Sequence, residues 1–309
     1  MKLLRRHPLS ELQDADCVLT VGAFDGLHRG HRVLIDRALA LGRQHRLPVV
    51  LLSFEPLPRE FLNAADPPPR LTNFRERWRL LQGFGLDGLC LLPFNEKLRQ
   101  MSGAQFVQQL RRLGARHVVV GHDFRFGRGG QADAAWCAEQ GRALGFAVDV
   151  VEPVQLVGQR IGSRLVRDAL AAGELKRAAD LLGRPYSMRG RVLRGRQLGR
   201  QLGFPTANIA MHRRRLPLSG IFAVRVHARG HAPPLQGRPG VASLGTRPTV
   251  NGGQPLLETF LFDFDGDLYG CEIEVEFVAR LRDEQKFESI ELMVEQMHRD
   301  AAQARAFLE

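Results

Sequence analysis

The first half of the 309-residue chain alternates short apolar runs with stretches in which apolar residues recur every three or four positions. Short continuous apolar runs are typical of buried strands, and the three-to-four spacing is typical of helices with one buried face. We therefore expect strands at 17–24, 47–54, 86–94 and 115–124, and helices at 31–45, 73–83 and 102–114. Ser102 is placed to cap the last of these helices. This alternation predicts an α/β domain with a doubly wound parallel sheet that binds ligands at the carboxyl ends of its strands.

The second half has a different pattern. After residues 181–190 the long helical spacing gives way to short β-like runs punctuated by glycine and proline, at 221–228, 240–245, 257–264 and 271–278. Such runs predict a small antiparallel β-barrel. An amphipathic stretch at 289–308 predicts a helix at the end of the chain. We expect two domains, 1–183 and 184–309.

Composition excludes several classes of protein. Hydrophobic residues make up 44% of the chain and charged residues 25%, which is ordinary for globular domains. No apolar run approaches the ~20 residues of a membrane span, and the first residues lack the apolar core of a signal peptide. The four cysteines are scattered without C-x-x-C spacing, so neither disulfides nor zinc are expected. We expect a cytoplasmic protein that has no membrane partner.

The formal net charge of +11 raises nucleic acid as a possible partner. Only four of the 44 basic residues are lysine, and the arginines are spread along the whole chain. The densest run, at 213–215, has no aromatic residues between its arginines. We attribute the charge mainly to codon usage and secondly to anionic nucleotide substrates, and we expect no nucleic-acid partner.

The densest motif of the first half follows the first expected strand and leads into the first expected helix. It comprises Gly22, Ala23, Phe24, Asp25, Gly26, Leu27, His28, Arg29, Gly30 and His31. Backbone N–H groups and the helix dipole favour phosphate at such a position. His28 and His31 lie three residues apart on one face, where two imidazoles can stabilise charge on a departing pyrophosphate. The alternative is that one histidine caps the helix while the other packs.

This decapeptide resembles the signature of the nucleotidyltransferase superfamily in its FAD-synthetase form. The resemblance implies that His28 and His31 take part in catalysis. It also implies that Gly22, Phe24, Asp25 and Gly30 bind the ATP phosphates. The segment 121–127 is similar to the family's G-x-[ND]-F-x-F-G segment, which implies that Asp123, Phe124 and Phe126 contact the flavin. The two phenylalanines could equally be alternate core residues of a strand.

Ser163 and Arg167 match the ends of the family's S-T-x-x-R motif, in which a hydroxyl and a guanidinium contact ATP phosphates. The alternative for Arg167 is a solvated arginine at a helix start. Three positions depart from the family: Arg164 replaces the threonine, Gly162 stands where a hydroxyl is common, and Leu57 stands where a histidine is usual. These departures leave the efficiency of adenylyl transfer open.

The second motif lies in the barrel half and joins glycines to a pair of hard oxygen donors. Its glycines are Gly190, Gly195, Gly199 and Gly203, and it ends in Pro205, Thr206, Ala207 and Asn208. On an extended segment residues i and i+2 share a face, so Thr206 and Asn208 can reach one Mg²⁺. The run resembles the riboflavin-kinase P-T-A-N motif, which implies that Gly195, Gly199, Gly203 and Pro205 contact ATP. The alternative is a glycine-rich barrel corner in which Thr206 and Asn208 cap turns.

Three downstream segments match the same family in order, at 245–249, 258–270 and 281–287. The resemblance implies that Glu258 accepts the proton of the ribityl 5′-hydroxyl. Arg247 and Arg282 are weaker candidates for flavin or phosphate contacts, because arginine is common throughout this chain.

Together the matches run from about residue 21 to residue 300, and the chain resembles the bifunctional riboflavin kinase and FMN adenylyltransferase family. That resemblance implies two separate ATP sites. The second domain would phosphorylate riboflavin to FMN with Mg²⁺, and the first would convert FMN and ATP to FAD and pyrophosphate. A monomer or weak homo-oligomer is expected. The alternatives are that only the kinase half is fully active, or that the chain binds nucleotides or RNA on a nucleotidyltransferase scaffold.

Overall fold

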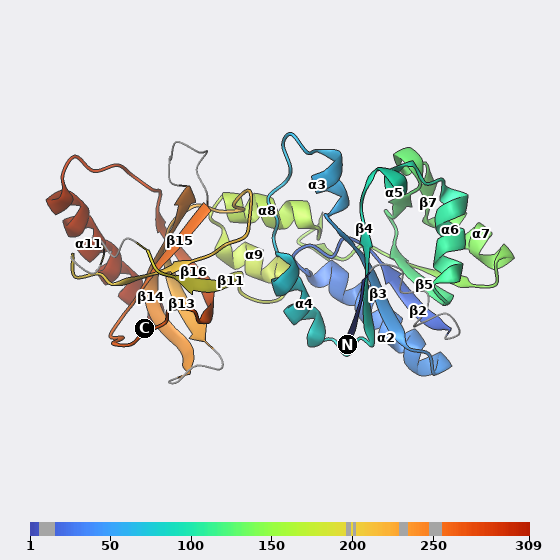
Figure 1. Ribbon diagram of the computed structural model, residues 1–309, viewed down its shortest axis with the longest axis horizontal. Helices are drawn as coiled ribbons and strands as arrows, with labels where there is room; N and C mark the ends of the chain where they lie inside the picture. The colour runs from blue at the N-terminus through green and yellow to red at the C-terminus, as the bar shows by residue number, and fades with distance from the viewer. Residues whose placement is uncertain (6–15, 196–198, 200–201, 229–233, 247–254) are drawn as a thin grey trace. The chain divides into compact units, whose positions relative to one another are not determined.

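The computed structural model describes residues 1–5, 16–195, 199, 202–228, 234–246 and 255–309, and the chain divides into two compact units. The first unit comprises Met1–Pro68 and Arg77–Gly162, and the second comprises Pro69–Glu76 and Ser163–Glu309. Figure 1 labels many of the elements of both units. Within the described residues, no helix has the length and apolar character that crossing a membrane requires.

The first unit is built on a six-stranded sheet in which every neighbouring pair is parallel, as expected from the sequence. In spatial order the strands are β1 (Lys2–Arg5), β4 (Gly88–Pro93), β3 (Val49–Glu55), β2 (Cys17–Val21), β5 (Ala115–Gly121) and β8 (Ala147–Val151). The edge strands β1 and β8 were not among the expected elements. The chain order reverses on either side of β2, since β3 and β5 flank it. The carboxyl ends of β2 and β5 therefore form the crevice where doubly wound sheets bind ligands.

Helices cover both faces of this sheet, which explains why all five residues of β2 are buried. Of these helices, α2 (Arg29–His45), α6 (Gly103–Arg112) and α7 (Ala134–Ala143) contact strands of the sheet. The other helices between β2 and β8 are α3 (Pro58–Leu62), α4 (Phe74–Gln82) and α5 (Glu96–Gln100), and the first three residues of α4 group with the second unit. The three expected helices are confirmed to within two residues at each end. Ser102 caps α6 as expected, since its side chain accepts a hydrogen bond from the Gln105 N–H.

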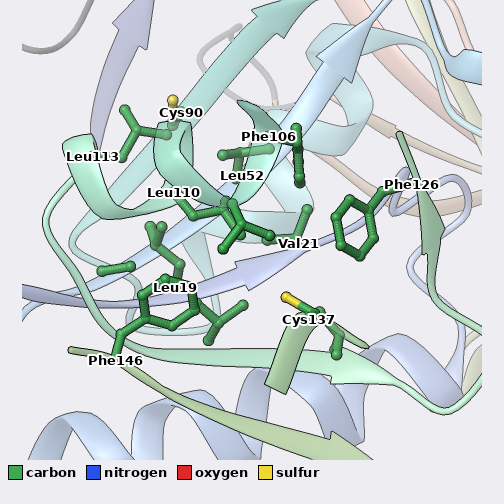
Figure 2. Packing of buried hydrophobic residues seen from close by; sticks show 14 of the residues in the cluster. Leu19, Val21, Leu52, Cys90, Phe106, Leu110, Leu113, Phe126, Cys137 and Phe146 are labelled. Carbon is green, nitrogen blue, oxygen red and sulfur yellow. The ribbon is translucent and has the colours of Figure 1, made fainter. Parts of the chain in front are cut away.

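One face of the sheet packs against α6 and α7, as Figure 2 shows. Leu19 and Val21 of β2 meet Leu110 of α6 and Cys137 of α7 in this core. Short segments beyond β5 complete the unit. They are β6 (Arg125–Phe126), the single 3₁₀ turn η1 (Arg128–Gly130), β7 (Ala132–Asp133), β9 (Gln155–Leu156) and β10 (Gln159–Arg160).

The second unit contains a closed barrel of six strands, each antiparallel to its neighbours, which confirms the expected architecture. In spatial order the strands are β11 (Ser187–Leu193), β12 (Thr206–Ile209), β15 (Pro255–Leu261), β14 (Leu235–Thr246), β13 (Gly220–Ala228) and β16 (Glu272–Arg282). The expected final helix is α11 (Ile290–Leu308), which packs on the barrel through Ala304 and Leu308. Two further helices, α8 (Ser163–Ala171) and α9 (Leu175–Leu182), group with the barrel although they precede residue 184.

A buried ion pair holds the segment Pro69–Glu76 within the second unit. Arg213 Nη2 lies 2.6 Å from Glu76 Oε2, and their side chains are 0% and 5% exposed. Glu76 Oε1 also accepts the backbone N–H of Arg189 at 2.8 Å. Burial alone would lower the pKa of Arg213, but Glu76 raises it above its ordinary value. One member of the arginine run at 213–215 is thus an internal structural residue and not part of a basic surface.

Candidate active sites

The first motif begins at the carboxyl end of β2 and forms an irregular loop. Phe24, Gly26 and Leu27 have φ angles of 51°, 80° and 46°. A non-glycine residue in this left-handed region costs about 1–3 kcal/mol, so the surrounding structure must hold the loop in place. The Phe24 side chain supplies part of that hold because it is fully buried. Gly22 leaves room for it, since a Cβ at Gly22 would lie 3.1 Å from the Phe24 ring.

The two motif histidines lie together at the start of α2. Their rings stack with centroids 3.6 Å apart and an interplanar angle of 16°. His28 is the N-cap, and its Nδ1 accepts the His31 backbone N–H at 3.3 Å. A neutral ring that accepts at Nδ1 carries its proton on Nε2, which is therefore a hydrogen-bond donor. Gly30 permits this arrangement, since a Cβ there would lie 3.1 Å from His28 Nδ1. The capping alternative thus holds for His28, and it is compatible with phosphate binding through Nε2.

The surroundings of His31 favour its neutral form. Burial lowers its pKa well below the ordinary value, and the adjacent His28 ring and Arg77 guanidinium lower it further. Its Nδ1 is buried and has no hydrogen-bond partner among the described residues. A neutral imidazole at this site can donate a hydrogen bond to a phosphate oxygen, but it does not act as a fixed positive charge.

The segment 121–127, which is predicted to contact the flavin, lies at the carboxyl end of β5, next to the end of β2 in the same sheet. Phe126 is buried and Phe124 packs against the same core, with the two rings stacked at 5.0 Å. Asp123 is exposed and forms an ion pair with Arg160. The core role of the two phenylalanines is therefore confirmed, and their flavin contacts stay a prediction.

Ser163 and Arg167 lie one turn apart on α8, within the second unit. Arg167 Nε donates to the Pro69 carbonyl at 2.6 Å, so its side chain is anchored and not simply solvated. Arg164 has an 87% exposed side chain that pairs with Asp168. A Cβ at Gly162 would meet nothing within 4 Å, so a larger residue fits there. Contact of Ser163 and Arg167 with the ATP phosphates remains a prediction from the sequence. Leu57, which stands where the family usually has a histidine, is buried.

In the barrel, the predicted catalytic and metal-binding residues lie on adjacent strands. Asn208 of β12 is the direct cross-strand partner of Glu258 of β15, and Glu258 is also paired with Ser243 of β14. Thr206 lies two positions before Asn208 and shares its face of β12, and both are partly exposed while Ala207 between them is buried. Directly opposed residues have Cβ atoms about 4.5–5.5 Å apart. Thr206, Asn208 and Glu258 therefore form one polar cluster.

Two glycines of the motif lie directly on the oxygen donors. A Cβ at Gly195 would lie 2.5 Å from the Asn208 side-chain amide nitrogen, and one at Gly199 would lie 3.1 Å from Thr206 Oγ1 and 2.3 Å from the Phe204 carbonyl oxygen. Only glycine allows the chain to approach so closely. Hydroxyl and amide oxygens beneath such a cradle fit Mg²⁺, which prefers oxygen ligands. Gly203 has a φ of 83° and, like Pro205, is exposed.

Arg247 lies outside the described residues, so its flavin contact stays a prediction. Arg282 is described, and its guanidinium is bound by Asp300 of α11 through Nε at 2.9 Å and Nη2 at 2.7 Å. The same guanidinium carbon lies 5.7 Å from the centre of the Phe287 ring. These contacts give Arg282 a structural role, and they leave its flavin contact a prediction.

Two residues near the candidate sites were not predicted from the sequence. Glu284 packs its carboxyl oxygens against the main chain at Gly245. Partial burial of this carboxyl group raises its pKa, the hydrogen bond from Ser243 lowers it, and nearby Glu258 raises it further. In the first unit, Arg77 binds the loop that precedes His28. Arg77 had no distinguishing sequence signal, because it is a common charged residue outside any recognisable motif. Glu284 lies within the matched segment 281–287, from which only Arg282 was proposed as a site residue.

The first unit has a parallel sheet with a loop typical of phosphate-binding sites at the point where the strand order reverses. The second unit has a barrel whose glycines approach a pair of oxygen donors. This combination is typical of two-domain, nucleotide-dependent transferases. The chain matches the family models described as FAD synthetase at residues 10–165 and riboflavin kinase at residues 182–308. It is 40% identical to the bifunctional riboflavin kinase/FMN adenylyltransferase of Escherichia coli (strain K12), over 99% of this chain and 98% of that one. With the protein of the same name from Pseudomonas fluorescens it shares 43% identity, over 99% and 97% of the two chains.

A solved structure from Streptococcus pneumoniae, titled a macrolide-efflux protein, superimposes with a TM-score of 0.81 at 30% identity and covers 96% of each chain. The chain belongs to the bifunctional riboflavin kinase/FMN adenylyltransferase family.

Proposed function

We propose that this chain phosphorylates riboflavin to FMN in the barrel and transfers AMP from ATP to FMN in the first unit. The observation that carries the kinase half is the cluster of Thr206, Asn208 and Glu258 beneath Gly195 and Gly199. A metal donor pair, a carboxylate acceptor and a close main-chain cradle are the parts that phosphoryl transfer to an alcohol needs.

In the kinase step, Glu258 receives the proton as the ribityl 5′-hydroxyl oxygen bonds to the γ-phosphorus and the bond to the β-phosphate oxygen breaks. Thr206 and Asn208 would hold Mg²⁺, which supplies positive charge to the ATP phosphates. Gly195 and Gly199 bring the main chain close enough for its N–H groups to donate to those phosphates. Glu258 lies beside Asn208 in the strand register, so the acceptor and the metal site are adjacent.

In the adenylyl step, a phosphate oxygen of FMN bonds to the α-phosphorus of ATP and the bond to pyrophosphate breaks, without a covalent enzyme intermediate. His28 donates through Nε2 and the neutral His31 donates to the same anionic chain. From their motif matches alone, we assign ATP-phosphate contacts to Ser163 and Arg167, and flavin contacts to Asp123, Phe124 and Phe126. We infer further that the enzyme requires Mg²⁺, works in the cytoplasm and is a monomer or weak homo-oligomer.

The test is chromatographic separation of flavins after incubation of the purified chain with riboflavin and Mg-ATP. FMN should accumulate first and FAD should follow, and omission of Mg²⁺ should abolish the kinase step. Accumulation of FMN without any FAD would refute the adenylyl half and leave a kinase. Salt-dependent RNA binding without flavin conversion would contradict both halves.

A further inference from the structure

Arg77 is the largest fully buried side chain of the protein's described residues, with 1% exposure, and it lies on α4 beneath the first motif. Its Nη1 donates to the Ala23 carbonyl at 2.9 Å. Its Nη2 donates to the Phe54 carbonyl at 3.4 Å and forms an ion pair with Glu55 at 3.1 Å. A buried guanidinium needs such acceptors, and two of the three are main-chain groups at the carboxyl ends of β2 and β3.

The Ala23 carbonyl oxygen accepts a second hydrogen bond, from Ser53 of β3. Ser53 Oγ, on the fully buried Ser53 side chain, donates to the same oxygen at 3.2 Å. Arg77 and Ser53 together fix the direction of this carbonyl toward the interior of the unit. In a planar trans peptide the C=O and the following N–H point in opposite directions. The Phe24 N–H is therefore turned away from Arg77 and Ser53, toward the outer side of the loop.

That orientation matters for an anion-binding loop. Successive N–H groups around left-handed residues form a concave nest that binds phosphate, whereas a carbonyl oxygen turned into the nest repels it. Phe24, Gly26 and Leu27 supply the left-handed residues here. The same guanidinium also contributes to holding His31 in its neutral state.

We propose that Arg77 is a positioning residue for adenylyl transfer, which holds the Ala23 carbonyl inward so that the Phe24 N–H faces the triphosphate. The inference rests on the proposed function, since it assigns a role within the FAD-forming site. Arg77 itself touches no substrate and acts through the loop.

The principal test compares Arg77→Met with Arg75→Met, which removes an exposed arginine from the same helix. FAD formation is measured from FMN and Mg-ATP, and FMN formation from riboflavin by the same preparation reports the integrity of the second unit. In Arg77→Met, kcat/KM for ATP in FAD formation should fall about 100-fold, as for loss of one oriented donor to a developing anion. The KM for FMN should change less than about 2-fold, and Arg75→Met should match the wild type.

Two further variants keep the test decisive if Arg77→Met folds poorly. Ser53→Ala removes the other donor to the Ala23 carbonyl without altering charge, and it should lower kcat/KM for ATP about 5-fold in FAD formation alone. In FAD formation, kcat/KM for ATP should be at least 10-fold higher in Arg77→Lys than in Arg77→Met. Unchanged FAD kinetics in Ser53→Ala and Arg77→Met would overturn the inference, as would an equal fall in both activities for Ser53→Ala. Absence of FAD formation by the wild type would instead refute the proposed function.

Discussion

In the proposed function, main-chain N–H groups of both units donate to the phosphates of a nucleotide, and the two units hold these groups in place by different means. In the first unit, buried side chains hold the loop that precedes α2. The Phe24 ring, Ser53 and Arg77 fix a main chain whose φ angles are unfavourable. In the second unit Gly195 and Gly199 rest directly on the side chains and main chain at β12, with no space for a Cβ.

The difference separates residues that shape a site from residues that touch the ligand. In the barrel, the cradle glycines and the donors Thr206 and Asn208 belong to one stretch of sequence and contact one another. In the first unit, the support comes from Arg77, which lies more than fifty residues after Ala23 along the chain. Substitution of a supporting residue remote in sequence should therefore disturb the loop of the first unit, whereas the cradle of the second unit should be disturbed mainly by substitutions within its own motif.

The largest expected effect is that of Glu258→Gln on FMN formation. Loss of the proton acceptor should lower kcat about 1,000-fold, within the range for general-base catalysis. FAD formation from supplied FMN should stay within 2-fold of the wild type, because none of the residues proposed for it lies on the barrel strands. The measurement is the initial rate of each reaction with one preparation. Glu276→Gln, on β16 of the same barrel, is the matched control and should retain both activities; comparable losses in the two variants would remove Glu258 from the mechanism.

The architecture was predictable from the sequence because local pattern determines it. Parallel strands covered on both faces give continuous apolar runs, and the Ser102 capping box marks the start of α6. The cross-strand pairing of Asn208 with Glu258 was not predictable, since register depends on the whole barrel. The resemblance placed both residues at one site, and the register supplies the physical reason.

The structural roles of buried charged residues could not be predicted from the sequence. Arg77 and Arg213 have the same sequence character as the exposed arginines around them, yet both are internal and bonded. Similarly, α8 and α9 group with the barrel although their helical pattern continues that of the first half. The segment Pro69–Glu76 joins that unit through Glu76, and no local pattern could reveal a partner at residue 213.

The next effect is that of the double variant His28→Ala, His31→Ala. It should lower FAD formation about 100-fold or more, since two donors to the triphosphate are lost, and leave FMN formation close to wild type. A matched control is available in the same unit, where His45 and His117 form a second stacked pair with centroids 4.1 Å apart. His45→Ala, His117→Ala should retain both activities. Equal loss of FMN and FAD formation in the first double variant would break the picture of two separate sites.

A smaller effect is expected from Gly199→Ala. The added Cβ would lie 2.3 Å from the Phe204 carbonyl oxygen, so the cradle must shift. Overpacking of this kind costs about 1–3 kcal/mol, and we expect a fall of about 10-fold in kcat/KM for ATP in the kinase reaction. Gly162→Ala adds the same methyl group where nothing lies within 4 Å, and it should leave both activities unchanged. A kinase that tolerates Gly199→Ala as well as Gly162→Ala would show that close main-chain approach is not required.

The smallest expected effect concerns the pH dependence of stability in the first unit. Because the pKa of His31 is lowered on folding, the unfolded chain binds a proton near pH 6.5 that the folded unit does not. The free energy of unfolding therefore falls as pH drops below about 6.5, with a slope of at most about 1.4 kcal/mol per pH unit from this residue. His31→Gln should reduce that slope. Both tryptophans, Trp78 and Trp136, lie in the first unit, so urea unfolding followed by tryptophan fluorescence reports on that unit. An unchanged slope between pH 5 and pH 6.5 would mean that His31 takes up a proton in the folded unit, and its role would then be that of a charged group, like the Lys and Arg of other phosphate sites.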